Sequence, residues 1–241
     1  MRRVDTRSRQ RGAALLILLT VAALGAASLF IGAARPDSLR RERELRNVAV
    51  VGQAREALIG FALAHGRLPR PAASSVNGAE RAGPCDSEAA CNGLLPWQAL
   101  GIEAGDAWGK LLYYSVTPVF TVAPVIRATS FGNKTVLTRD SHGAVIYVAG
   151  YPVCAPGTPC VAAVIRSAGR DNFGIGLDGR AQANASSTNI DEAANQAAVT
   201  DFMQLPLNAD ARAPGGEFDD LVAFIAPTQL YDAMARARVM P

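Results

Sequence analysis

The pattern of hydrophobic and polar positions begins with a long apolar run. Residues 12–34 carry no charged side chain and follow a short arginine-rich stretch, residues 1–11, which together with Gly12 forms a leader, residues 1–12. As a helix with about 1.5 Å of rise per residue, this run covers roughly 34 Å, against a bilayer hydrocarbon core of about 30 Å. The pattern therefore predicts a transmembrane helix over residues 13–34.

The helical pattern resumes beyond Pro36 and predicts a second helical half, residues 35–66. Apolar residues recur on one face at helical spacing, namely Leu45, Val48, Val51, Leu58, Phe61 and Ala62. Gly66, followed by Pro69, is typical of a helix end. We expect this face to pack on the rest of the chain.

Residues 67–241 read as one globular head. Short runs rich in branched and aromatic residues, separated by Gly, Pro, Asn and Asp, indicate strands joined as antiparallel hairpins. These runs are residues 111–116, 120–126, 144–149, 161–166 and 218–227, and short helices are expected over 191–199 and 228–239. The predicted fold is α+β: a long N-terminal spine helix, transmembrane in its first half, packed on an antiparallel β-sheet head.

The four cysteines fall as two local pairs, Cys85/Cys91 and Cys154/Cys160. An even number of cysteines in local pairs indicates disulfides and an oxidising compartment. The alternative is a zinc site, which usually uses cysteine pairs two to four residues apart. The second pair encloses a turn between two predicted strands, where a disulfide would clamp the end of a hairpin.

Charge and motif content exclude several functions. The net charge is only +3, and no lysine- or arginine-rich run follows the helix, so nothing indicates nucleic-acid binding. The sequence has no Gly-x-Ser-x-Gly elbow, no phosphate-binding glycine loop and no His-Glu-x-x-His. Asp219 and Asp220 are adjacent on a predicted strand, so their side chains point to opposite faces and cannot act as a catalytic pair. We expect no enzyme activity.

The junction before the apolar run resembles the processing site of type IV pilins and type II secretion pseudopilins. It reads Arg-Gly-Ala-Ala-Leu-Leu over residues 11–16. In that family a membrane-embedded prepilin peptidase cuts after the glycine and methylates the new amino terminus. The resemblance implies cleavage between Gly12 and Ala13 and methylation of Ala13. Most members carry a glutamate at the fifth mature position, where this sequence has Ile17, which suggests a minor or tip-located subunit.

Two head segments resemble those of major pseudopilins. Residues 106–114, Asp-Ala-Trp-Gly-Lys-Leu-Leu-Tyr-Tyr, are similar to the family's Asp-Pro-Trp-Gly turn and tyrosine strand. Residues 167–176, Ser-Ala-Gly-Arg-Asp-Asn-Phe-Gly-Ile-Gly, resemble its Ser-x-Gly-x-Asp-x-x-x-Gly loop. We interpret three large aromatic residues as packing anchors that can pin turns against the helix, namely Trp97, Trp108 and Tyr113.

Carboxylates near this loop bind calcium in the family. The oxygen ligands here would come from Asp171, Asp178, Glu217, Asp219 and Asp220. Their spacing is not that of an EF-hand, and an Asp/Gly turn with a solvated acidic loop explains the same residues. These carboxylates are therefore weak candidates for a metal site, and no cofactor is expected.

The resemblance implies a pilin-like structural subunit of a type II secretion pseudopilus or a type IV pilus. Such a protein is a single-pass protein of the bacterial inner membrane with its head in the periplasm. Its partners would be other pilins or pseudopilins through the N-terminal helix, prepilin peptidase, the inner-membrane assembly platform and membrane lipid. The alternative is a single-pass, membrane-anchored periplasmic binding or enzyme domain that the peptidase does not process.

Overall fold

The computed structural model describes residues 7–239, except for the side chains of residues 7–14 and 26–37. The chain divides into two compact units, Met1–Leu45 and Arg46–Pro241. The first helix, α1 (Arg7–His65), contributes to both units. The second unit, called the head from here on, contains both sheets and all other helices.

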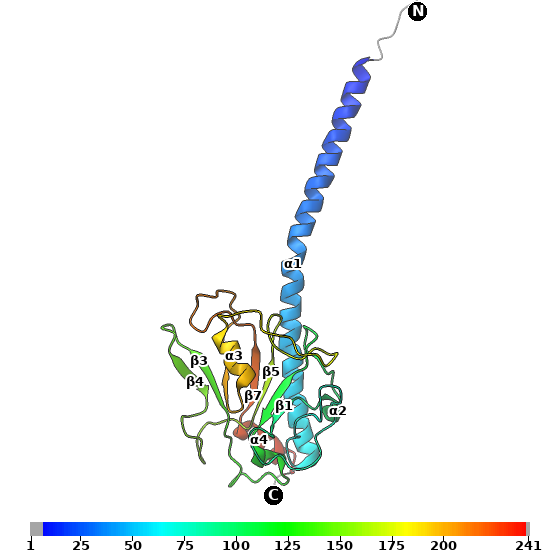
Figure 1. The fold of residues 1–241 in the computed structure, drawn as a ribbon. Coiled ribbons are helices and arrows are strands. Elements are labelled where there is room, and N and C mark those ends of the chain that lie inside the picture. Colours follow the sequence, from blue (N-terminus) through cyan, green and yellow to red (C-terminus); the bar gives the residue numbers. More distant parts are fainter. Residues whose placement is uncertain (1–6, 240–241) are drawn as a thin grey trace, which may run out of the picture. The chain divides into compact units, whose positions relative to one another are not determined.

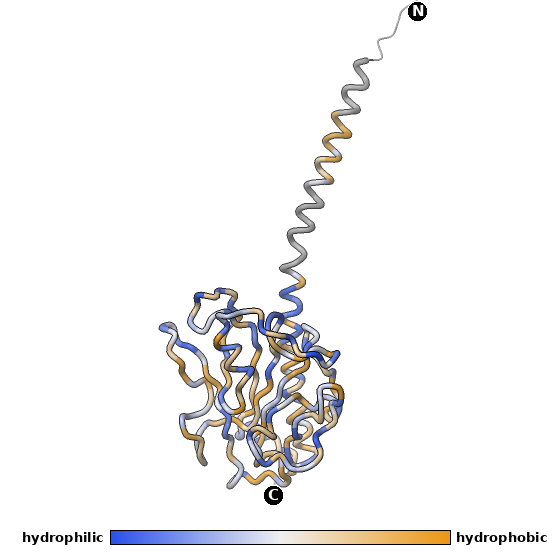
Figure 2. The backbone as a smooth tube through the Cα atoms, viewed as in Figure 1, coloured by the Kyte–Doolittle hydropathy of each residue, from blue (hydrophilic) through white to orange (hydrophobic). Residues whose placement is uncertain are grey.

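The predicted fold class is wrong in its helical part. Among the residues that the structure describes, no helix is long and apolar enough to cross a membrane. The described apolar side chains at the start of α1 cover residues 15–25, roughly 16 Å of helix, about half of a hydrocarbon core of about 30 Å. The next described side chains include the charged residues 40–44, and Figure 2 shows these two stretches in orange and blue. The described part of α1 is therefore not a long apolar spine.

The part of α1 that belongs to the head buries one face. Val51, Ala54, Leu58 and Ala62 are buried at spacings of three and four residues, as the sequence pattern predicts for the contact face of a helix. The helix ends at His65, where Gly66 adopts a φ of +69° and donates its N–H to the carbonyl of Ala62. The predicted helix end is confirmed.

Two residues expected on this face lie outside it. Leu45 is 73% exposed and Val48 is 58% exposed, whereas the polar Asn47 is buried. The buried face of α1 thus begins with an amide group, because a polar cluster of the head receives Asn47 at this level.

The main sheet has four antiparallel strands in the order β1-β2-β5-β7. Their bounds are β1 (Asn92–Leu94), β2 (Tyr113–Val116), β5 (Ala163–Ser167) and β7 (Leu221–Ile225). In register, Tyr114 lies opposite Ile165, and Ile165 opposite Ala223. Side chains alternate between the two faces of each strand, so these three residues share one face of the sheet.

That face packs against α1. Tyr114, Ile165 and Ile225 belong to one buried cluster with Leu58 of α1. The closing helix α4 (Pro227–Arg236) joins the same cluster through Leu230 and Met234. Figure 1 shows α1 and α3 on opposite sides of the main sheet.

A second, three-stranded sheet lies beyond the other face, in the order β4-β3-β6. Its strands are β3 (Thr135–Arg139), β4 (Val145–Ala149) and β6 (Asp201–Met203), and α3 (Ile190–Ala197) precedes β6. Val136 and Phe202 of this sheet form a small core with Val164 and Val222 of the main sheet. The head therefore has helix α1 on one face of its main sheet and a mixed layer on the other.

The connections differ from the predicted hairpins. The expected strand over 120–126 is a 3-10 turn, η1 (Pro118–Thr121), followed by a loop, because Pro118 and Pro124 each lack a backbone donor. Strands β3 and β6, which the sequence did not predict, pair in parallel. Strands β4 and β5 belong to different sheets, so Cys154 and Cys160 close a loop between sheets and not the end of a hairpin.

Candidate functional site: a polar cluster at the end of the main sheet

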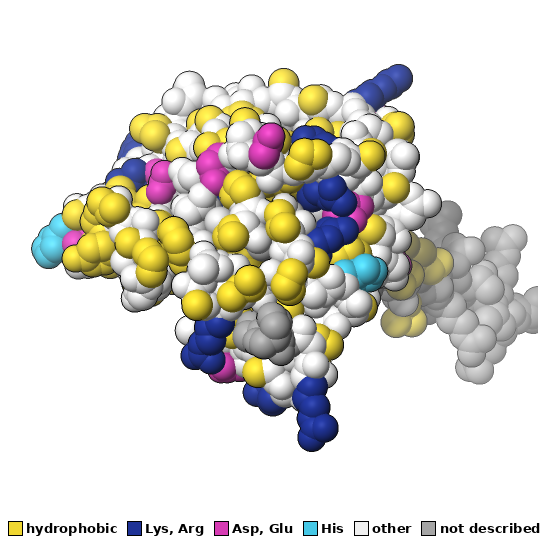
Figure 3. Space-filling model, turned by 90° about the horizontal axis from the view of Figure 1, so that it is seen from below, with side chains coloured by type: hydrophobic (Ala, Val, Ile, Leu, Met, Phe, Trp, Pro, Cys, Tyr) yellow, Lys and Arg dark blue, Asp and Glu magenta, His cyan; other side chains and the backbone are white. Residues whose placement is uncertain are grey.

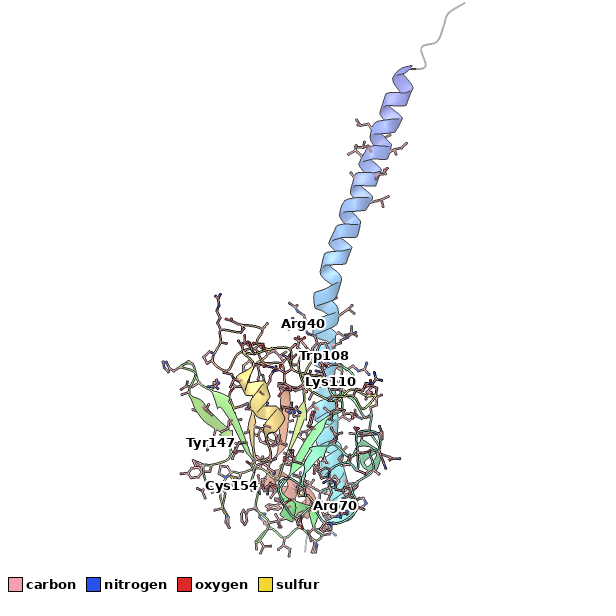
Figure 4. The ribbon with its side chains drawn as sticks, viewed as in Figure 1. Arg40, Arg70, Trp108, Lys110, Tyr147 and Cys154 are labelled. Carbon is pink, nitrogen blue, oxygen red and sulfur yellow. A yellow bond between two sulfur atoms is a disulfide. The ribbon has the colours of Figure 1, made fainter. Side chains whose placement is uncertain are left out.

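A buried polar cluster lies where strand β5 ends. It brings together the two segments that resemble pseudopilin motifs, residues 106–114 and 167–176, although they are distant in sequence. We call it the Asp106 cluster and define it by Asn47, Asp106, Lys110, Ser167, Glu192 and Asp219. Figure 4 places Trp108 and Lys110 at the same end of the head, beside α1.

Asp106 is the centre of the hydrogen bonds in this cluster. Its Oδ1 accepts the backbone N–H groups of Trp108 and Lys110, both at 2.9 Å, which closes the turn after it. Its Oδ2 accepts the hydroxyl of Ser167 at 2.6 Å. The Ser167 hydroxyl in turn accepts the side-chain N–H of Asn47 at 3.0 Å. One carboxylate therefore ties the turn, the end of β5 and helix α1 together.

The side chain of Lys110 binds backbone carbonyls of the second motif segment, residues 167–176. Its ammonium is buried and donates to three backbone carbonyls, those of Ala168 at 3.3 Å, Asn172 at 3.1 Å and Asp171. Burial lowers the pKa of Lys110, and the negative charges of Asp219 and Asp106 oppose that effect. The ammonium thus fills the space inside the loop and orders its carbonyls.

Steric hindrance by Asp219 explains why residue 169 of the same loop is a glycine. Gly169 adopts a φ of +60°, and a Cβ atom there would lie 2.1 Å from Oδ1 of Asp219. Oδ2 of Asp219 accepts the backbone N–H groups of Arg170 and Asp171 at 2.9 and 2.8 Å. A side chain at residue 169 would displace this carboxylate, so only glycine fits.

Glu192 of α3 lies against Asp219, and the two carboxyl groups affect each other. Glu192 Oε1 accepts the backbone N–H of Asp219 at 2.6 Å, and its Oε2 accepts the side-chain N–H of Asn189 at 2.7 Å. Burial first, then the charges of Asp219 and Asp220, raise the pKa of Glu192 to about 7. Burial also raises the pKa of Asp219. One of the two carboxyl groups can therefore hold a proton near neutral pH.

A buried ion pair lies next to the cluster. Nη1 of Arg166 on β5 donates to both carboxylate oxygens of Asp220, at 3.1 and 3.3 Å, and both side chains are almost fully buried. Asn195 of α3 donates to the same carboxylate at 2.8 Å. The Arg166 guanidinium also lies over the ring of Tyr113, 4.3 Å from its centroid. This pair fixes α3 on the main sheet.

The carboxylates proposed as metal ligands do not converge. Asp178 accepts the backbone N–H of Arg180, and Asp220 is paired with Arg166. Glu217 accepts hydroxyl groups of Ser186 and Thr188. Only Asp171 and Asp219 come close, through the backbone of Asp171. Among the residues whose side chains the structure describes, no group of three or more His, Cys, Asp or Glu could hold a metal ion.

The three aromatic residues singled out in the sequence have different surroundings. Trp97, the first residue of helix α2 (Trp97–Leu100), packs with a small core around Leu94 and Leu111, and over Gly78, where a Cβ atom would meet its ring at 2.1 Å. Tyr113 packs in the same small core and against Arg166. Trp108 is partly exposed and follows Asp106 in the turn. None of the three is among the residues that pack with α1 in the main core.

The remaining predicted sites are the disulfides and the processing junction. The structure pairs Cys85 with Cys91 and Cys154 with Cys160. Gly12 and Ala13 lie within the helical range of α1, but their side chains fall outside the described residues.

Two cavities lie at the other end of the head. The larger, about 620 Å³, is lined by Arg67, Arg70, Val119 and Val122 among others. Both arginines bind Glu80, at 2.5 and 2.9 Å. Burial would raise the pKa of Glu80, but hydrogen bonds from Arg67 and Arg70 outweigh it and lower the pKa to about 2. Glu80 therefore neutralises one of the two positive charges beside this cavity.

The arrangement of the Asp106 cluster is suited to holding elements together. Its polar groups form bonds between α1, the turn, the loop and α3, except Oδ1 of Asp219, which is buried without a hydrogen-bond partner. No hydroxyl or thiol stands next to a histidine in it. Sequence reasoning missed Asn47, Lys110, Arg166 and Glu192. A signal was present for Asn47 alone, since it is a polar residue within the apolar stripe of a helix.

Comparison with known proteins adds no relative. No family model, no curated protein and no solved structure matches the chain.

Proposed function

We propose that the chain is a pilin-like structural subunit that assembles into a type II secretion pseudopilus or a type IV pilus, as a minor subunit. Prepilin peptidase would cleave it between Gly12 and Ala13. The amino-terminal segment would then associate with membrane lipid, the inner-membrane assembly platform and the corresponding segments of other pilins or pseudopilins. The head would lie in the periplasm, and the chain would act neither as an enzyme nor on nucleic acid.

The observation that carries this proposal is the connection between α1 and the two motif segments. Asn47 of α1 donates to Ser167, and Ser167 donates to Asp106, so one chain of buried hydrogen bonds runs from the helix to both motifs. A subunit that assembles through its amino-terminal segment needs the end of its helix bound firmly to the head, and these bonds hold Asn47 of α1 to the head. Both motif segments that these bonds connect resemble segments of pseudopilins, which is why the connection supports a pilin-like subunit.

The disulfides and the amino-terminal sequence support the same proposal. Two local disulfides suit a head in an oxidising compartment such as the periplasm. The arginine-rich leader ends in Arg11-Gly12 immediately before the apolar run. A glycine before the run, and not a small residue after it, distinguishes this junction from a secretory signal peptide.

The test is the intact mass and the amino-terminal sequence of the membrane-extracted protein, with and without the prepilin peptidase of its host. We expect a methylated Ala13 start only where the peptidase is present. A Gly12→Val variant should keep the Met1 start, because the peptidase cuts after a glycine. A Gly32→Val variant is the matched control and should be processed normally.

A Met1 start in both backgrounds would contradict the proposal. The chain would then fit the alternative class, an unprocessed, membrane-anchored periplasmic binding or enzyme domain. The cavity beside Arg67 and Arg70 would be the first place to test for a ligand in that case.

A further inference from the structure

The chain contains two asparagines that are followed directly by glycine, Asn77-Gly78 and Asn92-Gly93. At such a pair the backbone nitrogen of the glycine can attack the side-chain amide carbon of the asparagine, because glycine has no side chain that hinders the approach. The reaction needs a glycine N–H that is not held in a bond, an amide carbon close to that nitrogen, and a leaving group that reaches water. The structure gives the two pairs opposite surroundings in these respects.

Asn77 lies in a turn that is fixed by hydrogen bonds. Its carbonyl accepts the N–H of Ser74 at 3.2 Å, and its own N–H donates to the Ser74 hydroxyl at 3.1 Å. Arg70 and Glu80 flank this turn in sequence and bind each other, with Nε of Arg70 2.9 Å from Oε1 of Glu80. Figure 3 shows side chains of opposite charge side by side at this end of the head. The turn therefore has a defined conformation in the folded chain.

The side chain of Asn77 is held beside the nitrogen of Gly78. Its Oδ1 accepts the backbone N–H of Ala79 at 2.9 Å, and this bond folds the side chain back over the peptide group that joins residues 77 and 78. The same N–H stabilises the negative charge that develops on Oδ1 when the amide carbon is attacked. Asn77 is exposed, so its Nδ2 can leave into solvent.

The N–H of Gly78 is available for the reaction. Among the described residues, no backbone or side-chain acceptor bonds to it, although the Gly78 carbonyl accepts the N–H of Gln98 at 3.0 Å. The ring of Trp97 covers the side of Gly78 on which a Cβ atom would lie, whereas its nitrogen is bonded to the exposed Asn77. A backbone N–H without a protein partner bonds to water, and water is also the acceptor for the proton that this nitrogen loses.

The second pair, Asn92-Gly93, is held by the main sheet. Both residues belong to strand β1, and Gly93 lies directly opposite Tyr114 of β2. Two residues earlier, the Cys91 carbonyl accepts an N–H of β2 at 3.0 Å. Bonded and non-bonded pairs alternate along an antiparallel ladder, so the N–H of Gly93 is used in a bond to Tyr114. Nδ2 of Asn92 donates to the carbonyl of Ala198 at 3.0 Å, so the leaving group is held as well.

We propose that Asn77 is a site of spontaneous deamidation in the folded chain, and that Asn92 is protected. The nitrogen of Gly78 loses its proton to water and forms a bond to Cγ of Asn77. The bond from Cγ to Nδ2 breaks, and Nδ2 takes up a proton from water and leaves as ammonia. Water then opens the resulting succinimide ring at either of its two carbonyls, which leaves an aspartyl or an isoaspartyl residue. This modification goes beyond the proposed function and depends only on the head.

The experiment follows both asparagines in the purified full-length protein during storage at neutral pH. Trypsin separates them, because residues 68–81 and 82–110 fall in different peptides. Mass spectrometry then measures the increase in mass when an amide becomes an acid. We expect at least a tenfold higher rate at residue 77 than at residue 92 in the folded protein. After unfolding in guanidinium chloride with the disulfides reduced, the two rates should converge, because the sheet no longer protects Asn92.

Two variants provide matched controls. Asn77→Gln keeps the amide but requires a larger ring, so the peptide of residues 68–81 should keep its mass. Asn92→Gln should leave the rate at residue 77 unchanged, and circular dichroism checks that both variants are folded. Equal rates at residues 77 and 92 in the folded protein would overturn the proposal. So would a rate at residue 77 that is at least tenfold lower in the folded protein than in the unfolded one, because the turn would then protect Asn77.

Discussion

The hydroxyl of Ser167 donates to Oδ2 of Asp106 at 2.6 Å across 61 residues of sequence. This bond joins the end of a central strand to the turn that precedes another strand of the same sheet. Because Asn47 of α1 donates to the same hydroxyl, the bond also connects the head part of α1 to the main sheet. The stability of the head should depend on it more than on any single contact at the surface.

A double-mutant cycle measures this bond. Ser167→Ala and Asp106→Asn each leave buried polar groups without a partner, and we expect each to reduce the free energy of unfolding by about 1–3 kcal/mol. Since the two groups contact each other, the double variant should lose less than the sum, with a coupling of about 0.5–3 kcal/mol. Urea unfolding followed by fluorescence supplies the four values. Strictly additive losses would mean that the two residues do not interact.

Removal of the internal cation should loosen the second motif. Lys110→Met keeps much of the side-chain volume but leaves the carbonyls of Ala168, Asp171 and Asn172 without their donor. We expect a loss of about 1–3 kcal/mol in unfolding free energy, with faster amide hydrogen exchange across residues 168–172. Arg180, which is exposed and pairs with Asp178, provides the control. Arg180→Met should change neither the free energy of unfolding nor the amide hydrogen exchange of residues 168–172. Unchanged exchange in the Lys110 variant would contradict the role of the ammonium.

Removing one charge of the Arg166–Asp220 pair should reduce the free energy of unfolding far more than replacing both residues with apolar ones. Arg166→Met leaves the Asp220 carboxylate buried without its cation, and we expect a loss of about 3–5 kcal/mol. Combining it with Asp220→Leu removes both charges and should recover a large part of that loss, because no unpaired charge remains. Thermal and urea unfolding of the single and double variants test this. A double variant less stable than Arg166→Met would be the opposite result.

The raised pKa of Glu192 predicts a pH dependence. Its pKa is about 7 in the folded chain, against an ordinary value of 4.5. Between these two values the folded chain holds a proton that the unfolded chain has released, so the free energy of unfolding falls as the pH rises. The loss is complete above about pH 7 and should be on the order of 2 kcal/mol.

Glu192→Gln cannot ionise and should flatten this dependence. The matched control is Glu103→Gln, whose side chain is 80% exposed, and it should keep the wild-type slope. Unfolding free energies measured from about pH 4.5 to about pH 7.5 give the comparison. A variant at Glu192 with the same slope as the wild type would show that another group titrates in this range.

Local signals in the sequence predicted much of the secondary structure. Gly66 ends α1 as expected, because glycine adopts a positive φ there without strain. The branched runs around Ile165 and Phe224 are strands β5 and β7, and the segment after Pro227 is helix α4. Each of these elements depends on residues that are neighbours in the chain. The expected strand over 120–126 failed because Pro124 within it and Pro118 just before it outweigh its branched residues.

The sequence by itself determined the α+β class, the antiparallel main sheet, and the approximate bounds of its central strands and closing helix. It also marked both motif segments, through their resemblance to segments of pseudopilins. The tertiary structure alone decided that the two motifs meet at Asp106, that Arg166 pairs with Asp220, and that β3 pairs in parallel with β6. It also decided that both faces of β4 stay exposed. These features depend on which segments come together across long stretches of chain, and hydrophobic periodicity carries no information about that pairing.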